Sequence, residues 1–234
     1  MKALILAGGI GSRLKQRVPD LPKPMAPIAG RPFLEYILDQ LNQSEVTDVI
    51  LSVGYRADII RSYFGERYHE LNLTYCEEEQ PLGTGGAIAY ALSKQKPETY
   101  LVLNGDTFID ISFQKLIKFY GGSTSSVTMV LKEMEDVSRY GTVMVKNDEV
   151  IGFVEKGNYG QGLINAGVYL LHSKLFKEFD MPEVFSLEHD LLQAHIKTLR
   201  PRAWITDAWF IDIGVPSDFD RAQIELPRVV GSTR

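Results

Sequence analysis

A glycine-rich loop near the N-terminus, followed by two basic side chains, is the segment of the sequence best suited to chemistry. Residues 6–14 read Leu-Ala-Gly-Gly-Ile-Gly-Ser-Arg-Leu, and Lys23-Pro24-Met25 begins nine residues later. Glycines leave backbone amides bare, so that a phosphate chain can approach them, while Arg13 and Lys23 add positive charge. The pattern indicates a triphosphate site. The expected nucleotide contacts in this loop are Leu6, Ala7, Gly8, Gly9, Gly11 and Ser12.

Two better-known phosphate loops do not fit this segment. A Walker loop needs Gly-Lys followed by Ser or Thr, whereas Lys15 lies between Leu14 and Gln16. The dinucleotide fingerprint needs a third glycine three residues after Gly11, where Leu14 stands. If the glycines are considered without the basic residues, the alternative to a phosphate site is an ordinary turn with solvated charges nearby.

Two aspartates stand where apolar runs end. Asp106 closes Asn104-Gly105-Asp106 after the apolar run 99–103, and Asp212 follows the strand-like segment 208–211. Mg²⁺ is commonly held by one or two carboxylates, with water and substrate phosphates completing its shell. The pair could therefore bind Mg²⁺. An ordinary Asn-Gly-Asp turn and a helix N-terminal acid are the alternatives.

The apolar periodicity predicts an α/β fold that positions these residues. Strands are expected at 2–6, 48–53 and 99–103, and helices at 33–42, 57–64 and 84–93. In such parallel winding, ligands bind at the carboxyl ends of the strands, where the glycine loop and Asp106 both fall. The later chain is richer in strand patterns, which indicates a flanking antiparallel lobe. The segments concerned are strands at 126–132, 141–146, 149–155 and 163–171 and helices at 186–197 and 217–226. We expect one domain over 1–226 and a loose tail over 227–234.

Composition narrows the class of protein. The chain has 234 residues, a net charge of −5 and one cysteine, Cys76, so an internal disulfide and a multi-cysteine metal cluster are excluded. Residues 1–31 nevertheless carry six basic side chains against one acidic one. A focused basic segment on an acidic chain suits a small polyanion and argues against nucleic-acid binding. No leader or membrane-length apolar run is recognisable, so a cytoplasmic location is expected.

Further motifs extend over nearly the whole chain and resemble those of the sugar-1-phosphate nucleotidylyltransferases. They are the glycine loop with Lys23-Pro24, the segment Pro81–Ala87, Arg139–Val143, Glu155-Lys156 and Leu163–Tyr169. The resemblance implies a GT-A-like, Rossmann-type three-layer fold with a predominantly parallel central sheet and a small antiparallel sugar-binding lobe. It also implies Mg²⁺ dependence.

The resemblance assigns roles to individual residues. The implied catalytic set is Arg13, Lys23, Asp106, Lys156 and Asp212, with Asp106 and Asp212 as metal ligands. A second nucleotide-contacting segment comprises Glu79, Pro81, Leu82, Gly83, Thr84 and Gly85. Sugar contacts are expected from Asn104, Tyr140, Gly141, Glu155, Asn165 and Ala166.

The implied reaction joins a nucleoside triphosphate to a sugar 1-phosphate and releases pyrophosphate. The resemblance over the whole chain implies GTP and a heptose 1-phosphate as the pair. Glu78 or Glu79 could accept hydrogen bonds from guanine N1 and N2, although a solvated acidic loop is the alternative for Glu77, Glu78 and Glu79. Mannose 1-phosphate, or a uridylyl or thymidylyl transfer, is the alternative. A GT-A glycosyltransferase would need an Asp-x-Asp motif, and Asp110 is too far from Asp106 to provide it. A regulatory paralogue that only binds nucleotide-sugar also stays open, as does the choice between monomer and homodimer.

Overall fold

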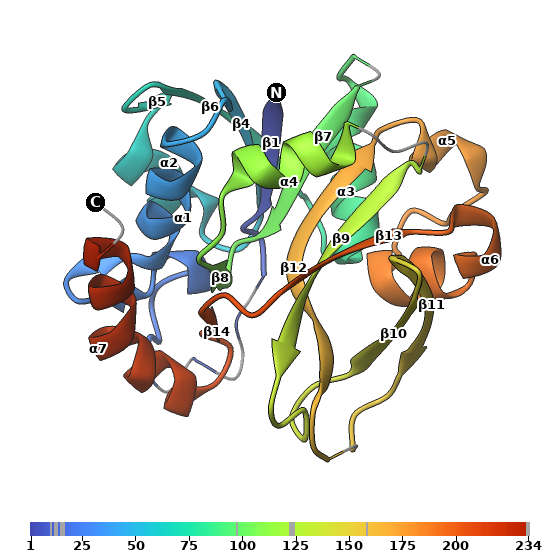
Figure 1. Ribbon diagram of the computed structural model, residues 1–234. Coiled ribbons are helices and arrows are strands. Elements are labelled where there is room, and N and C mark those ends of the chain that lie inside the picture. Colours follow the sequence, from blue (N-terminus) through green and yellow to red (C-terminus); the bar gives the residue numbers. More distant parts are fainter. Residues whose placement is uncertain are drawn as a thin grey trace. The chain divides into compact units, whose positions relative to one another are not determined.

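The computed structural model shows an α/β chain divided into two compact units (Figure 1). It describes residues 1–9, 11, 14, 17–96, 98–121, 125–157 and 159–232. Unit 1 comprises residues 1–81, 103–113 and 209–234, and unit 2 comprises 82–102 and 114–208. Each unit is therefore assembled from stretches that are far apart in the sequence.

Parallel strands form the centre of unit 1. Strands β1 (Lys2–Leu6), β4 (Asp48–Val53) and β6 (Leu71–Glu77) run side by side, and β5 (Arg67–Tyr68) pairs antiparallel with β6. The middle of β1 is buried on both faces, as is usual for a parallel strand covered by helices. Helices α1 (Phe33–Asn42) and α2 (Ala57–Phe64) lie in the connections between these strands. The carboxyl ends of β1, β4 and β6 therefore share one edge of the sheet.

Unit 1 also contains a 3-10 helix, short strands and a C-terminal helix. Their bounds are Lys23–Met25 for a 3-10 helix, Pro27–Ile28 (β2), Arg31–Pro32 (β3), Thr107–Ile109 (β8), Phe210–Asp212 (β14) and Pro216–Ser232 (α7). β8 and β14 pair antiparallel, as do β2 and β3. Helix α7 continues through residues 227–232, where the sequence predicts a loose tail. Phe219, Ala222 and Leu226 are buried at helical spacing, so the helix is anchored up to Pro227 and continues past it.

Unit 2 is built mainly from antiparallel strands. Its strand order is β10-β11-β13-β9-β12-β7. β12 pairs antiparallel with β9, and β10 with β11, whereas β13 runs parallel to β9. The bounds are Thr99–Asn104 (β7), Val127–Met134 (β9), Thr142–Lys146 (β10), Glu149–Val154 (β11), Gly162–His172 (β12) and Arg202–Thr206 (β13).

Helices of unit 2 include one irregular segment. The α-helices are Gly83–Ser93 (α3), Phe113–Tyr120 (α4), Leu175–Glu178 (α5) and Ile196–Leu199 (α6). The helix expected over 186–197 is instead a π-helix, Leu187–Gln193, followed by α6. Short π-helical segments are rare and occur often at functional sites.

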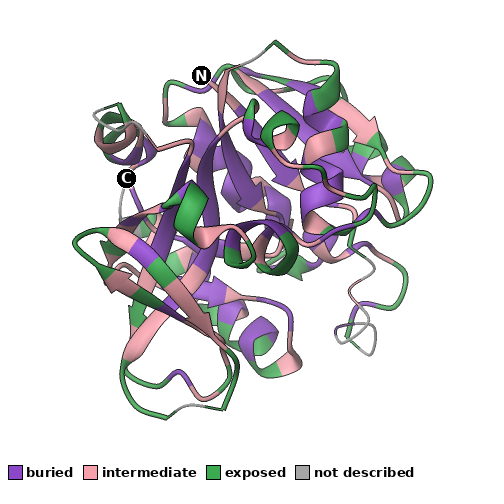
Figure 2. Cartoon of the chain, turned by 90° about the vertical axis from the view of Figure 1, so that its right-hand side faces the viewer, coloured by how far each residue is buried: buried purple, intermediate pink, exposed green. Residues whose placement is uncertain are grey.

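The burial pattern follows the sheets, whose strands are mostly buried while loops and hairpins are exposed (Figure 2). The mixed α/β class predicted from the sequence is confirmed, with parallel strands in unit 1 and mainly antiparallel strands in unit 2. Among the described residues, no helix has the length and apolar character that crossing a membrane requires.

Candidate active site

Lys23, Asp106 and Asp212 meet within unit 1. The Lys23 ammonium lies 2.5 Å from Asp106 Oδ2 and 3.5 Å from Asp212 Oδ1. Asp106 comes directly before β8 and Asp212 ends β14, and the pairing of these two strands places Asp212 opposite Thr107. Residues from three distant parts of the sequence thus form one charged cluster. Their catalytic and metal-binding roles stay predictions.

Two glycines make room for this cluster. A β-carbon at Gly214 would lie 2.7 Å from Asp212 Oδ1 and 2.9 Å from Lys23 Nζ. The Gly214 amide also donates a 2.7 Å hydrogen bond to Asp212 Oδ1. A β-carbon at Gly105 would lie 2.5 Å from the Leu6 carbonyl oxygen, to which the Gly105 amide donates. A side chain at Gly105 would force the backbone to shift, because the atom it meets belongs to the main chain. A side chain at Gly214 would displace the ends of the Asp212 and Lys23 side chains and so disturb their contact.

The electrostatics of the cluster are unbalanced toward negative charge. Burial raises the pKa of the Asp212 carboxyl, and the neighbouring Asp106 carboxylate raises it further. The Lys23 ammonium and the Gly214 amide act in the opposite direction. One lysine therefore faces two carboxylates, which leaves room for an additional positive charge.

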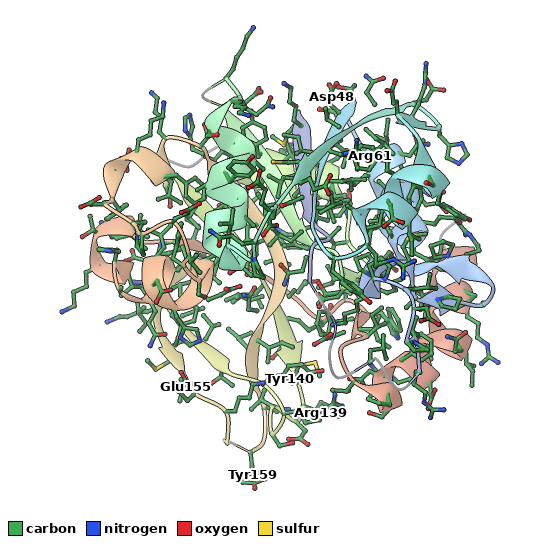
Figure 3. The ribbon with its side chains drawn as sticks, turned by 180° about the vertical axis from the view of Figure 1, so that it is seen from behind. Asp48, Arg61, Arg139, Tyr140, Glu155 and Tyr159 are labelled. Atoms are coloured by element: carbon green, nitrogen blue, oxygen red, sulfur yellow. The ribbon has the colours of Figure 1, made fainter. Side chains whose placement is uncertain are left out.

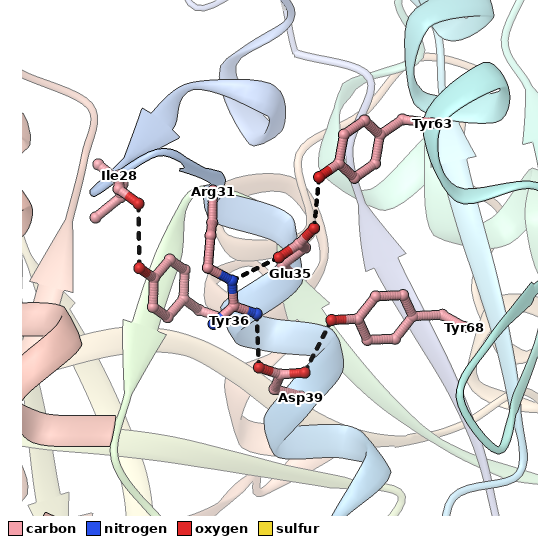
Figure 4. A network of polar contacts seen from close by, with 7 residues as sticks. All are labelled: Ile28, Arg31, Glu35, Tyr36, Asp39, Tyr63 and Tyr68. Carbon is pink, nitrogen blue, oxygen red and sulfur yellow. Dashed lines mark hydrogen bonds and ion pairs between the residues drawn. The ribbon is translucent and has the colours of Figure 1, made fainter. Parts of the chain in front are cut away.

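The segment that follows Lys23 is fixed by polar contacts (Figure 4). The Tyr36 hydroxyl donates to the Ile28 carbonyl in the β2–β3 hairpin. Arg31, which is paired with Ile28 in this hairpin, makes ion pairs of 2.6 Å with Glu35 and 2.7 Å with Asp39 on α1. The hairpin is thereby tied to a helix, which restrains the backbone that continues from Lys23.

Tyrosines from the neighbouring elements complete this network. The Tyr63 hydroxyl donates to Glu35, and the Tyr68 hydroxyl donates to Asp39. Burial and the hydrogen bond to Asp39 raise the pKa of Tyr68. Arg31 and a tyrosine hydroxyl thus contact each acidic side chain on α1, so that both carboxylates are hydrogen-bonded although they are largely buried.

The glycine-rich loop follows directly from β1 in unit 1. Leu6 ends the strand, and the buried Ala7 donates its amide to the Ser52 carbonyl. Gly11 has a φ of +62°, and a β-carbon there would lie 3.0 Å from Lys23 Cβ. Gly9 has open space around its α-carbon. The loop therefore approaches the charged cluster through Gly11, whereas the predicted contacts Ser12 and Arg13 lie outside the described residues.

Glu78 is placed beside this loop, and Glu79 is exposed. The buried Ser52 hydroxyl donates a 2.9 Å hydrogen bond to Glu78 Oε1, and a β-carbon at Gly8 would lie 3.1 Å from the same atom. The predicted nucleotide contact Pro81 is exposed as well. Of the two glutamates considered for base recognition, Glu78 is the one that a hydrogen bond from Ser52 fixes beside Gly8.

The donor set of the cluster fits a cation that also binds substrate phosphates. Asp106 and Asp212 each direct one oxygen to the same position, which the Lys23 ammonium contacts. Asn104, two residues before Asp106, has a buried Oδ1 with no hydrogen-bond partner among the described residues. Within the described part of the chain, no group of three or more His, Cys, Asp or Glu could hold a metal. Such a two-carboxylate set is typical of Mg²⁺ sites completed by phosphates and water.

Unit 2 carries a cavity of about 230 Å³ that gathers most of the predicted sugar contacts. Tyr140, Gly141, Glu155, Lys156 and Asn165 line it. Figure 3 labels Tyr140 and Glu155, which lie just before β10 and just after β11. The predicted contact at 166 is a fully buried alanine outside the lining, so its side chain packs in the core instead.

Polar residues of the π-helix also line the cavity, and they were not predicted from the sequence. Glu188, His189 and Gln193 come from the π-helix. His189 Nδ1 lies 4.0 Å from Glu155 Oε1. Regular α-helical spacing would place His189 and Gln193, four residues apart, on one face and Glu188 away from it, so no single helical stripe predicts all three together.

The predicted nucleotide segment 82–85 has a packing role that the sequence did not reveal. The amides of Gly85 and Gly86 donate to the Phe185 carbonyl, and the Phe185 amide donates to the Leu82 carbonyl. A β-carbon at Gly83 would lie 2.5 Å from the Phe185 carbonyl oxygen, and one at Gly85 would overlap the Phe185 ring. These glycines therefore allow close packing against Phe185. Nucleotide contact by this segment stays a prediction.

Comparisons with known proteins identify the family of the chain. The family model described as nucleotidyl transferase matches residues 2–228. The chain is 48% identical to a D-glycero-alpha-D-manno-heptose 1-phosphate guanylyltransferase of Campylobacter jejuni, over 94% of this chain and 97% of that one. It is 43% identical to the protein of the same name from Aneurinibacillus thermoaerophilus, over 98% and 100%.

A solved structure has the same fold. HddC from Yersinia pseudotuberculosis, complexed with GMP-PN, matches with a TM-score of 0.84 and 36% identity, and the match covers 96% of this chain and 99% of that chain. A family model that spans nearly all of the sequence, near full-length relatives and a shared fold lead to one conclusion. The chain belongs to the nucleotidyl transferase family.

Proposed function

We propose that this protein is a D-glycero-α-D-manno-heptose 1-phosphate guanylyltransferase, which converts GTP and the heptose 1-phosphate to GDP-heptose and pyrophosphate. The near full-length relatives carry that name. The observation that supports the chemistry is the meeting of Lys23, Asp106 and Asp212 beside the glycine loop. A cytoplasmic location, where GTP is available, goes with this proposal.

The reaction needs little proton transfer. A sugar 1-phosphate has a second pKa of about 6, so its oxygen attacks without a protein base. This oxygen forms a bond to the α-phosphorus of GTP, and the bond from that phosphorus to the bridging oxygen breaks. The electron pair leaves with pyrophosphate. The enzyme must therefore hold two anions together and stabilise the charge on the leaving group.

Basic residues perform these tasks in our proposal. Lys23 holds the α-phosphate or pyrophosphate, and Arg13 neutralises the leaving phosphates. Lys156, which lines the cavity of unit 2, holds the phosphate of the incoming sugar. Asp106 and Asp212 hold Mg²⁺, which when bound neutralises charge on the triphosphate.

The nucleobase and the sugar are contacted by separate groups. Glu78, fixed by Ser52 beside Gly8, accepts hydrogen bonds from guanine N1 and N2. A uracil or thymine ring does not offer that pair of donors. Glu155 and Asn165 line the cavity of unit 2 and bind sugar hydroxyl groups.

Pyrophosphate release measured with each of the four nucleoside triphosphates and a panel of sugar 1-phosphates tests the proposal. We expect the highest kcat/KM for GTP with the heptose 1-phosphate, ahead of mannose 1-phosphate, and no turnover when Mg²⁺ is removed with EDTA. Asp106→Asn should lower kcat by about 10²-fold or more, in the range found when an electrostatic group is removed from an active site. Asp58→Asn, at an exposed side chain on α2, is the matched control. A higher kcat/KM for another pair would refute the substrate assignment.

A further inference from the structure

The Glu188 carboxylate in unit 2 collects hydrogen bonds from three separate parts of the chain. Its Oε1 accepts from the Tyr169 hydroxyl at 2.6 Å and from Asn165 Nδ2 at 3.4 Å. Its Oε2 accepts from the Thr84 hydroxyl at 3.2 Å and from the Ser186 hydroxyl at 3.4 Å. A carboxylate offers about four acceptor positions, so these donors occupy its capacity. Glu188 therefore acts on other side chains rather than as a free ligand for the sugar.

The π-helix brings Glu188 to this position. Leu187, Leu191 and Leu192 are buried, and they anchor the segment. The Ser186 hydroxyl accepts from the His189 amide at its N-terminus. Because these leucines are buried, Glu188 is positioned in the lining of the cavity of about 230 Å³ described above.

One set of contacts from Glu188 fixes the orientation of Asn165. The Asn165 Nδ2 donates a 2.6 Å hydrogen bond to the Tyr169 hydroxyl, which itself donates to Glu188. The Gly167 amide donates to Asn165 Oδ1, so that both ends of the amide are held. The register of β12 shifts between Asn165 and Tyr169, and Gly167 there has a φ of +72°. Because of this irregularity, the Gly167 backbone amide and the Tyr169 side chain can both contact the Asn165 amide group.

The opposite oxygen of Glu188 fixes Thr84. The Thr84 hydroxyl donates to Glu188 and accepts from the Leu187 amide at 2.9 Å. Thr84 lies in the first turn of α3, within the predicted nucleotide segment. One carboxylate thereby links that segment to the strand that carries Asn165.

The negative charge of Glu188 determines the direction of the hydrogen bonds that the hydroxyl groups of Tyr169 and Thr84 make to it. A carboxylate only accepts, so the hydroxyls of Tyr169 and Thr84 must both donate to it. The Tyr169 oxygen is then left to accept from Asn165. A glutamine has the same shape but presents an NH₂ group on one side. In a Glu188→Gln variant one of the two hydroxyls must therefore reverse its direction.

We propose that Glu188 is a positioning residue for sugar binding, which orients Asn165 through Tyr169 and couples it to the nucleotide segment at Thr84. The inference rests on the proposed function, because it assumes that Asn165 binds the sugar. It predicts that loss of Glu188 weakens sugar binding without removing a group that takes part in the reaction.

Steady-state kinetics of Glu188→Gln test the proposal. Pyrophosphate release is measured with varied heptose 1-phosphate at saturating GTP and Mg²⁺. We expect KM for the sugar phosphate to rise about tenfold, while kcat changes less than threefold. Glu178→Gln, at an exposed side chain at the end of α5, is the matched control and should leave both constants unchanged. A purely structural role would instead lower the melting temperature and the active fraction, which leaves KM unmoved.

Tyr169→Phe shows whether the effect passes through the tyrosine hydroxyl. We expect this variant to raise KM for the sugar phosphate as well. In the double variant Glu188→Gln/Tyr169→Phe, KM should be no higher than in the single variant with the higher KM. An unchanged KM in Glu188→Gln, or KM effects that multiply in the double variant, would overturn the inference. Absence of wild-type turnover with every substrate pair would overturn the proposed function, and the inference with it.

Discussion

Replacing Lys23 by methionine removes the cation that faces two carboxylates while keeping a side chain of similar length. The Lys23 side chain is only 11% exposed, whereas those of Asp106 and Asp212 are 36% exposed. Two unit charges 3.5 Å apart attract by about 5 kcal/mol at an effective dielectric constant of about 20. Solvent screening of the aspartates and the cost of burying the ammonium reduce this value. We expect a net loss of about 2–3 kcal/mol, which is about 5–10 °C in melting temperature for a chain of this size.

The loss of stability caused by Lys23→Met should depend on pH in a defined direction. The folded-state pKa of Asp212 is already raised, because of burial and then Asp106, and removing Lys23 raises it further. A group whose pKa is raised by folding favours the folded state at low pH, and this contribution is lost as pH rises through the folded pKa. Lys23→Met should therefore be closer to wild type at pH 5 than at pH 7. Added Mg²⁺ should stabilise the variant at pH 7, because it binds the folded carboxylate pair.

Thermal unfolding at both pH values, with and without Mg²⁺, measures these effects. Lys197→Met, at an exposed lysine in α6, is the matched control and should unfold like wild type under all conditions. The same Lys23 variant should lose about 10²-fold in kcat. A deficit of equal size at pH 5 and pH 7, or an unchanged melting temperature, would refute the electrostatic account of the cluster.

Three other substitutions test separate parts of the structure. Gly85→Ala should lower the free energy of unfolding by about 1–3 kcal/mol, because its β-carbon meets the Phe185 ring. In denaturant unfolding, the double variant Gly85→Ala/Phe185→Leu should lose less stability than the sum of the two single losses. Additive losses would contradict the packing of Gly85 against Phe185. Glu78→Gln should reduce the preference for GTP over UTP in kcat/KM while Glu79→Gln does not, and equal effects would argue against Glu78 as the base contact. Arg31→Met should cost about 2–3 kcal/mol in urea unfolding, since two largely buried carboxylates lose their cation, whereas a neutral outcome would show that the tyrosine hydroxyls suffice.

Periodicity predicted the regular elements well because tertiary packing and local pattern agree there. Strands 2–6 and 48–53 and helices 33–42 and 57–64 are found as predicted. The short hairpin of β2 and β3 was missed, because two-residue strands carry no periodic signal. The helix expected over 186–197 begins in π-helical form, a geometry that 3.6-residue spacing does not encode.

The site was predictable where a strand end carries its own chemical group. Asp106 and Asp212 could be proposed from their positions after apolar runs, and the structure places both beside Lys23. The contribution of Glu188 could not be foreseen, because it depends on contacts with Tyr169 and Thr84 that are distant in the sequence. The glycines of segment 83–86 showed a similar limit, since a glycine-rich sequence does not distinguish nucleotide approach from close packing.

The interleaved order of unit 1 also governs how the protein matures during synthesis. Its first stretch ends at residue 81, yet the partner strand of β8 and the second carboxylate are supplied only after residue 208. A ribosome adds roughly 5–20 residues per second, so Asp106 leaves the tunnel several seconds before Asp212 follows. Throughout that interval the nascent chain carries only one aspartate of the pair, so the charged cluster with Lys23 assembles only after β14 has been synthesised.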